Sequence, residues 1–250
     1  MPWRAATACV AGSAHVKAAL PCQDASLFEI RDSILFGTIA DGAGSAARSD
    51  EGAQAAVKAA LAELKSHQWL SDTPRDDLEK RLRDACGKAR EALNAAAAER
   101  ALPADDFACT LTLFAASKEW LAALQVGDGQ LVVRRSESYD LIFKPDRGEY
   151  CNETTFLTSA GIDAGIQVSI VEGAPLFVCA ATDGIERVSL RYQDWTPHHA
   201  FYKPLEDFIA AAAHPDAAAR DIEEFLRREK LNQYTDDDKT LLLAAWREGA

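Results

Sequence analysis

Two short apolar segments of this chain lead directly into an aspartate followed by glycine. Residues 34–40 run into Asp41, and residues 176–181 lead through one threonine to Asp183. A short apolar run bounded by such a turn signal is typical of a buried strand. Asp237 precedes the last apolar run of the chain. If that last strand runs antiparallel to the other two, its beginning lies at the same sheet edge as their ends, and we expect the three carboxylates to converge.

A convergence of carboxylates indicates a site for divalent cations. Like charges a few ångströms apart raise each other's pKa, so the cluster is costly without cations. Mg²⁺ and Mn²⁺ prefer carboxylate, carbonyl and water oxygens as ligands. A glycine after the aspartate allows a sharp turn and a close approach of its carbonyl to a metal. A single Asp-Gly pair is more often only a turn, so the prediction depends on the combined set.

The order of elements predicts an α+β fold in a single domain over residues 1–250. One apolar strand is followed by two long helical patterns within residues 49–100, then several strands, two helices near 204–213 and 216–230, and a final strand. Such segregation favours antiparallel sheets covered by helices over alternating βαβ units. Residues 120–126 and 131–134 flank a Gly-Asp-Gly turn, which predicts a hairpin. Residues 144–170 are polar and the least regular part of the chain.

Composition excludes several classes of protein. Thirty-nine acidic and 27 basic residues give a net charge of −12, which disfavours nucleic-acid binding because that affinity rests on Lys and Arg neutralising phosphates. No apolar run approaches the roughly 20 residues that span a bilayer, and Met1-Pro2-Trp3-Arg4 lacks a secretory signal. The six cysteines include no CxxC pair, which argues against a zinc ribbon and gives no disulfide framework. We therefore expect a cytoplasmic protein without a membrane partner.

A series of short motifs resembles the type 2C, metal-dependent protein phosphatase family, and is most similar to its compact bacterial branch. The order and spacing of the motifs carry the resemblance, which extends from about residue 12 to residue 245. The motifs are Gly12-Ser13-Ala14-His15, Gln23-Asp24-Ala25, Ala40-Asp41-Gly42-Ala43-Gly44, Ala108-Cys109-Thr110-Leu111, Val126-Gly127-Asp128-Gly129, Thr182-Asp183-Gly184-Ile185-Glu186 and Asp237-Asp238-Lys239-Thr240.

The resemblance implies a four-layer αββα sandwich, with two antiparallel β-sheets flanked by helices. It also implies hydrolysis of phosphoserine and phosphothreonine by direct attack of a water that bridges two divalent ions, Mn²⁺ or Mg²⁺. In matched positions, Asp41 bridges both metals, the Gly42 carbonyl binds one of them, and Asp183 and Asp237 complete the other. The partners implied are a phosphorylated protein substrate and an opposing Ser/Thr kinase.

Three further matched positions have outer roles in the family. Asp24 matches an acid that reaches a metal through water. Asp128 matches an acid linked to a third, weaker metal. Thr240 matches a structural position beside the last ligand.

The sequence departs from the family pattern at two positions. Many members carry a phosphate-binding arginine where this chain has Ala19, with only Lys17 and His15 nearby. We therefore expect Lys17 or His15 to bind the substrate phosphate, or phosphate binding to be weaker; His15 can equally cap or order its own loop. Some relatives have a histidine at Ala43, so here water must protonate the leaving group. The resemblance also places a flap within residues 144–170.

Three alternatives stay open or are disfavoured. A catalytically weak or inactive family member that binds phosphoproteins as a regulatory module is consistent with Ala19, although the retained acids argue against it. A small phosphate ester as substrate is not excluded by the same metal site. A cysteine-nucleophile phosphatase is disfavoured, because no cysteine is followed by arginine six positions later.

Overall fold

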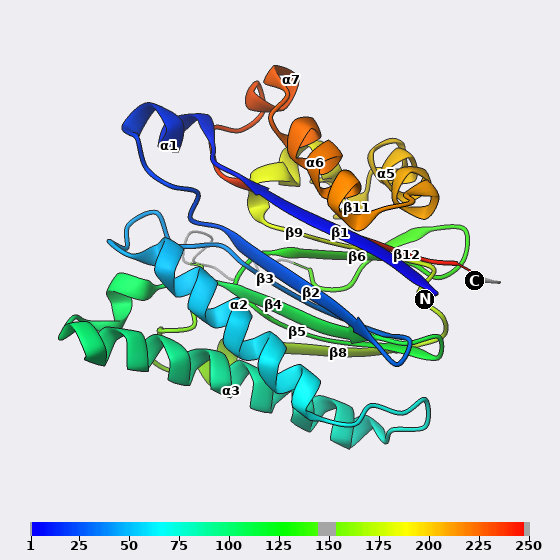
Figure 1. Cartoon of the computed structure of the whole chain (residues 1–250), viewed down its shortest axis with the longest axis horizontal. Helices are drawn as coiled ribbons and strands as arrows, with labels where there is room; N and C mark the ends of the chain where they lie inside the picture. The colour runs from blue at the N-terminus through cyan, green and yellow to red at the C-terminus, as the bar shows by residue number, and fades with distance from the viewer. Residues whose placement is uncertain (1, 145–153, 248–250) are drawn as a thin grey trace.

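The computed structural model describes residues 2–144 and 154–247, and its described part is built around two stacked five-stranded sheets (Figure 1). All strand pairs in both sheets are antiparallel. The first sheet contains, in spatial order, β1 (Trp3–Val10), β12 (Lys239–Trp246), β9 (Phe177–Ala181), β6 (Gln130–Arg134) and β7 (Tyr139–Leu141). The second contains β2 (Ala25–Arg31), β3 (Ile34–Ala40), β4 (Leu111–Ala116), β5 (Trp120–Val126) and β8 (Gln167–Glu172).

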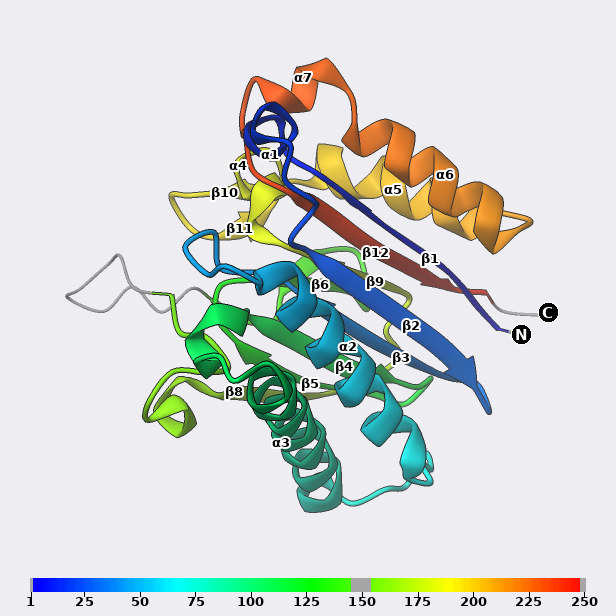
Figure 2. The same ribbon diagram turned by 60° about the vertical axis from the view of Figure 1, so that its left-hand side comes forward.

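Helices cover the outer face of each sheet, as Figures 1 and 2 show. The long helices α2 (Ser49–Ser66) and α3 (Arg75–Arg100) pack on the second sheet, and α5 (His199–Ala211) and α6 (Pro215–Leu226) pack on the first. Shorter helices are α1 (Ser13–Ala18), α4 (Glu186–Ser189) and α7 (Glu229–Asn232), with 3₁₀ turns at η1 (Ala104–Phe107), η2 (Ile162–Gly165) and η3 (Asp183–Ile185). A small ribbon pairs β10 (Leu190–Arg191) with β11 (Thr196–Pro197). The predicted αββα sandwich is confirmed.

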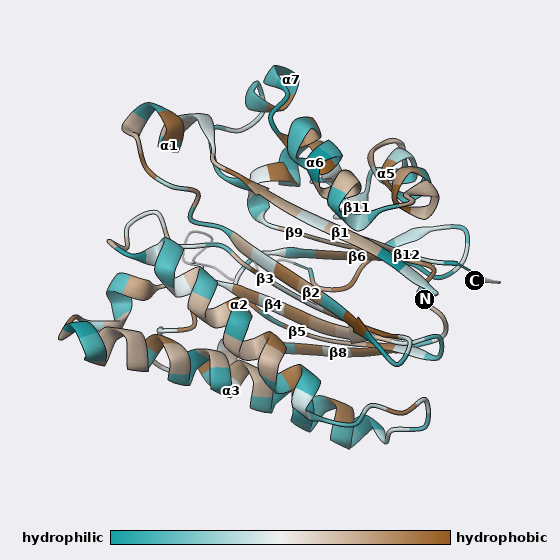
Figure 3. Cartoon of the chain, in the orientation of Figure 1, coloured by the Kyte–Doolittle hydropathy of each residue, from teal (hydrophilic) through white to brown (hydrophobic). Residues whose placement is uncertain are grey.

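The burial of β3 on both faces follows from its place in the four layers. Its side chains alternate between the two faces of the sheet. Leu35 and Ile39 join the cluster between the two sheets, whereas Phe36 and Ala40 face the layer of α2 and α3. A third cluster fills the space between the first sheet and α5 and α6. Both faces of the inner strands are therefore covered. In Figure 3 the strands of the second sheet are mainly brown, and α2 and α3 beside them are mixed in colour.

The predicted hairpin around Gly127-Asp128-Gly129 is wrong. β5 pairs with β4 and β8, and β6 pairs with β7 and β9 in the other sheet. The turn, in which Gly127 has φ of +98°, carries the chain from one sheet to the other. A local turn signal gives no information on which strand is the hydrogen-bonding partner. The consequence is that Asp128 lies where the ends of both sheets meet.

Residues 144–170 contain a strand that the sequence pattern did not indicate. The described part of the segment includes η2, and β8, which begins at Gln167, forms an edge of the second sheet beside β5. Its side chains are mostly half-buried, which weakens the apolar signal. Residues 145–153, on which much of the expected flap falls, lie outside the described residues.

The C-terminal helices differ in length from the prediction. α5 begins five residues earlier than residue 204, and the predicted helix 216–230 is divided into α6 and the short α7. The search of the described residues finds no helix with the length and apolar character that crossing a membrane requires.

The close packing of Gly184 against the last strand gives a stability prediction. A Cβ added at Gly184 would lie 1.8 Å from the carbonyl oxygen of Asp238, so the Gly184→Ala variant must shift backbone. We expect its free energy of unfolding to fall by about 1–3 kcal/mol in thermal or urea unfolding of the metal-free protein. Gly87→Ala is the matched control, because Gly87 lies within α3 with no atom within 4 Å of its added Cβ, and the change should raise stability by about 0.5–1 kcal/mol. Equal effects of the two substitutions would contradict this packing.

Candidate metal centre

The structure brings four of the five predicted aspartates together around one small hollow, whose described lining does not include Asp24. Asp41, Asp128, Asp183 and Asp237 all line this cavity of about 160 Å³, together with Gly42. We call it the acidic hollow. The three strand-end acids do not come from one sheet edge as expected: Asp41 follows β3 in the second sheet, whereas Asp183 follows β9 and Asp237 precedes β12 in the first. The acidic hollow therefore lies at the end of the seam between the two sheets.

Backbone hydrogen bonds fix the position of Asp41. Its N–H donates to Thr110 Oγ1 over 3.0 Å, and the Thr110 N–H donates back to the Asp41 carbonyl over 2.8 Å. Gly42 forms an isolated bridge with Cys109, and its N–H donates to the Gln23 carbonyl over 3.2 Å. The Asp41-Gly42 turn is thus held from two sides.

Asp24 is buried and held by two threonines. The hydroxyls of Thr182 and Thr240 donate to Asp24 Oδ2 over 2.8 and 2.7 Å. The Thr240 N–H in turn donates to Thr182 Oγ1 over 3.1 Å. Asp24 Oδ1 is buried and has no hydrogen-bond partner among the described residues. Thr240, matched only to a structural position, therefore orients an acidic side chain directly.

Asp238 is one of two residues whose role the sequence did not indicate. Its carboxylate accepts hydrogen bonds from the N–H groups of Gly12, over 2.7 Å, and Gln23, over 2.5 Å. His15 Nδ1 lies 2.8 Å from the same carboxylate. The side chain of Asp238 is 3% exposed and ties the loop before β2 to the start of β12. In the sequence it is one of three consecutive aspartates, and nothing there distinguishes it from its neighbours.

This contact changes the expectation for His15. The imidazole orders the N-terminal loop through Asp238, so the structure favours an ordering role over the predicted contact with substrate phosphate. Lys17 is exposed on α1 and is not among the described residues that line the acidic hollow.

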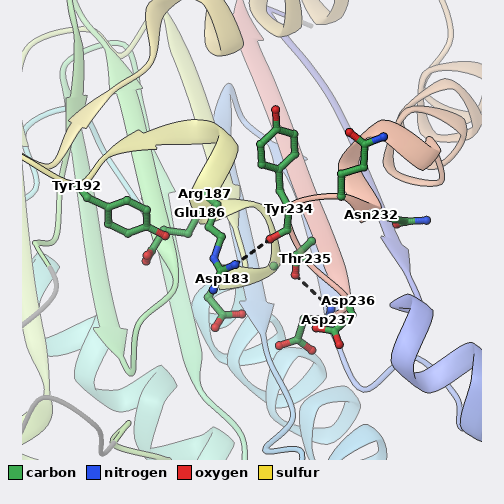
Figure 4. A pocket seen from close by; sticks show the side chains of 11 residues that line it. Asp183, Glu186, Arg187, Tyr192, Asn232, Tyr234, Thr235, Asp236 and Asp237 are labelled. Atoms are coloured by element: carbon green, nitrogen blue, oxygen red, sulfur yellow. Dashed lines mark hydrogen bonds between the residues drawn. The ribbon is translucent and has the colours of Figure 1, made fainter.

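A cation that the sequence did not single out lies beside the acids. Arg187, on α4, lines a second cavity of about 500 Å³ that also contains Asp183 and Asp237 (Figure 4). Its guanidinium donates to the Tyr234 carbonyl over 3.3 Å. We call this cavity the outer pocket. It adjoins the acidic hollow, since Asp183 and Asp237 line both.

The remaining two acids are held differently. Asp128 Oδ2 accepts a hydrogen bond from Thr154 Oγ1 over 2.9 Å. Asp237 Oδ1 accepts one from the N–H of Asp238 over 2.8 Å, which orients the carboxylate from its own backbone.

Burial makes ionisation of Asp24, Asp41 and Asp183 unfavourable. Burial, followed by the charges of Asp24, Asp183 and Asp237, raises the pKa of Asp41 well above its ordinary value. Burial also raises the pKa of Asp24 to about 7, against the hydrogen bonds from its two threonines. The pKa of Asp183 rises to about 6, first because of burial and then because of Asp128 and Asp237. A bound cation would favour the ionised form of these three carboxyl groups.

The donor set fits hard divalent cations. Asp24 Oδ1 and Asp183 Oδ1 are buried oxygens without a hydrogen-bond partner among the described residues. No three described His, Cys, Asp or Glu side chains close around a single point. That geometry is compatible with Mg²⁺ or Mn²⁺, because such ions use one or two carboxylates each and complete their shells with water or carbonyl oxygens.

Comparison with known proteins agrees with this fold and site. The sequence matches the family described as "Protein phosphatase 2C" over residues 11–227. It is 34% identical over 255 residues to serine/threonine-protein phosphatase 3 of Escherichia coli (strain K12), which covers 99% of this chain and 100% of that protein. The chain therefore belongs to the protein phosphatase 2C family.

Solved structures share the fold at low identity. The serine/threonine phosphatase Stp1 from Staphylococcus aureus superposes with a TM-score of 0.66 at 12% identity, covering 98% of this chain and 95% of that one. The catalytic domain of the phosphatase PstP, in complex with 2 manganese ions, gives a TM-score of 0.62 at 18% identity, with 98% and 99% coverage. This protein is thus a metal-dependent protein serine/threonine phosphatase, and the non-hydrolytic binding module is not favoured.

The raised pKa values predict a stability that depends on pH and metal together. An aspartate in the unfolded chain has a pKa of about 3.9. In the metal-free folded protein the pKa of Asp24 is about 7 and that of Asp183 about 6. Between about pH 4 and pH 7 the folded state therefore binds more protons than the unfolded state. The stabilisation that Asp24 and Asp183 contribute is fully present below about pH 4 and is lost as the pH rises to about 7. Divalent ions replace those protons.

We therefore expect added Mn²⁺ to raise the melting temperature more at pH 8 than at pH 5, as measured by differential scanning calorimetry. Asp183→Asn should reduce this difference. A larger effect of Mn²⁺ at pH 5 would contradict the assignment.

Proposed function

We propose that the acidic hollow holds two divalent ions, Mn²⁺ or Mg²⁺, and there hydrolyses phosphoserine and phosphothreonine in proteins. The observation that carries the proposal is the set of four aspartates around one hollow, two of which, Asp41 and Asp183, have a pKa raised by burial and by neighbouring carboxylates. The ligands proposed are Asp41, the Gly42 carbonyl, Asp183 and Asp237. The two manganese ions in the PstP catalytic domain support the number and the metal.

When bound, such ions supply a Lewis acid and activate water for attack on phosphorus. Asp41, at the end of β3, is the ligand that we propose would be shared between the two ions. Asp24, which Thr182 and Thr240 orient through hydrogen bonds, is proposed to contact a metal ion through an ordered water. Asp128 is proposed to bind a third, weaker ion beside the crossing between the sheets. Because Ala43 carries no proton donor, the leaving alkoxide takes its proton from water.

Binding of the substrate phosphate needs a cation that stands in for the arginine replaced by Ala19. Lys17 is exposed on α1 and is not among the described residues that line the acidic hollow or the outer pocket. Arg187 lines the outer pocket beside Asp183 and Asp237, and its planar guanidinium can bind phosphate through two hydrogen bonds. We propose Arg187 as the phosphate-binding residue. We also propose that a Ser/Thr kinase phosphorylates the same substrate and that the protein is cytoplasmic.

The first test is the substitution of the shared ligand. Asp41→Asn removes the charge proposed to bridge both ions, and we expect at least a 1,000-fold loss of kcat with p-nitrophenyl phosphate and with a phosphothreonine peptide. Wild-type activity should require Mn²⁺ or Mg²⁺ and be lost with chelator. Substantial turnover by the variant would refute the assigned role of Asp41.

Asp128→Ala is the matched contrast. It should lower kcat while two ions per chain remain bound, as measured by isothermal titration calorimetry. Loss of both ions in this variant would show that Asp128 belongs to the main pair.

A second test distinguishes the two cations. Arg187→Ala should raise KM for p-nitrophenyl phosphate about tenfold, because a hydrogen-bonded charge pair contributes on the order of 1.5–3 kcal/mol. Lys17→Ala should leave KM unchanged, and Arg187→Lys should restore only part of the loss. A larger rise in KM for Lys17→Ala than for Arg187→Ala would instead show that Lys17, on α1, binds the substrate phosphate.

A further inference from the structure

A groove beside the outer pocket has a chemistry opposite to that of the metal centre. It has a volume of about 540 Å³ and lies between α4, the start of α5, the end of α6 and α7. Its apolar walls include Phe201, Phe225 and Leu231, and its cations are Arg187, Arg228 and Lys230. We call it the basic groove. Its helices lie together on the outer side of the first sheet in Figure 2.

The basic groove carries unbalanced positive charge on an acidic protein. The chain has a net charge of −12, yet no acidic residue is among the described residues that line the groove. Arg228 and Lys230 are exposed, and no ion pair within the described part of the chain involves either of them. The Arg228 guanidinium lies 5.6 Å from the centre of the Phe225 ring. Apolar walls beside available cations are suited to a ligand with both apolar and acidic groups.

The basic groove adjoins the outer pocket, which in turn adjoins the acidic hollow. Arg187 and Tyr234 line both the basic groove and the outer pocket, and the outer pocket contains Asp183 and Asp237. In Figure 4 the Tyr234 ring points away from the two aspartates, while its carbonyl faces Arg187. A polypeptide with a phosphorylated residue at the acidic hollow can therefore continue past Arg187 into the groove.

We propose that the basic groove docks a segment of the phosphoprotein substrate that flanks the phosphorylated residue and carries acidic and apolar side chains. The proposal rests on the proposed function, which places phosphoserine or phosphothreonine at the acidic hollow. Charge complementarity selects the occupant, because the acidic hollow repels carboxylates and the basic groove attracts them. Extended polyanions are disfavoured, since the remainder of the surface carries the negative charge of the chain.

The test uses binding as well as turnover. Three fluorescein-labelled phosphothreonine peptides share one core and differ in the flank, which is acidic and apolar, acidic with serine in place of each apolar residue, or basic and apolar. Fluorescence anisotropy with the Asp41→Asn variant in Mn²⁺, which is slow enough to leave the peptides phosphorylated, should give the tightest Kd for the first peptide, and about tenfold weaker binding for the other two. Equal affinities for all three would overturn the proposal.

Charge reversal locates the binding surface. The double variant Arg228→Glu/Lys230→Glu should weaken binding of the acidic, apolar peptide about tenfold and raise its KM, with kcat and KM for p-nitrophenyl phosphate unchanged. Lys58→Glu/Arg220→Glu is the matched control, because both residues are exposed and lie outside the groove, and the net charge changes equally. Equal losses in the two double variants would overturn docking in the groove.

The outcomes separate the two proposals. One outcome is a wild-type protein that binds the acidic, apolar peptide selectively but hydrolyses neither p-nitrophenyl phosphate nor the phosphothreonine peptide. That result would support docking in the groove and refute the proposed function. Hydrolysis of both substrates without flank selectivity would retain the function and refute the groove. Binding of anionic lipid vesicles that Arg228→Glu/Lys230→Glu abolishes, with no peptide selectivity, would assign the groove to a membrane surface and overturn the proposal.

Discussion

Burial of aspartates that are held close together at fixed strand ends is the constraint on which the site depends. Asp41, Asp183 and Asp237 cannot move apart, because each is joined directly to, or lies within two residues of, a strand packed on both faces. Burial and neighbouring charge raise the pKa of Asp41 and Asp183 in the absence of metal. Cations relieve this cost, so the same feature that weakens the metal-free fold supplies the driving force for metal binding.

The hydrogen bonds of the buried acids Asp238 and Asp24 determine whether each has a structural role or can contribute to metal binding. Asp238 accepts from two backbone N–H groups and contacts His15, so its lone pairs are used in joining the N-terminal loop to β12. Asp24 uses one oxygen for two threonines and leaves the other without a described partner. The strand-end acids face the hollow. A residue's position in this network, rather than its identity as an aspartate, determines what it can bind.

The sequence predicts features that depend on local signals, and it does not predict those that depend on contacts between distant parts of the chain. The strands that end at Asp41 and Asp183 were predictable because burial and the turn are local signals. The crossing at Gly127-Asp128-Gly129 was mistaken for a hairpin, because the choice of sheet depends on distant strands. Asp238 and Arg187 were missed for a similar reason, since their partners Gly12 and Tyr234 are brought to them only by the tertiary fold.

The central claim is that two ions occupy the acidic hollow and share Asp41. Anomalous scattering from crystals grown with Mn²⁺ tests it most directly. We predict two anomalous peaks, about 3.5–4 Å apart, with Asp41 in contact with both. The same crystals of Asp41→Asn should lose at least one of them. Well-ordered crystals at saturating Mn²⁺ with no peak at Asp41, or with peaks only at other carboxylates, would contradict the account.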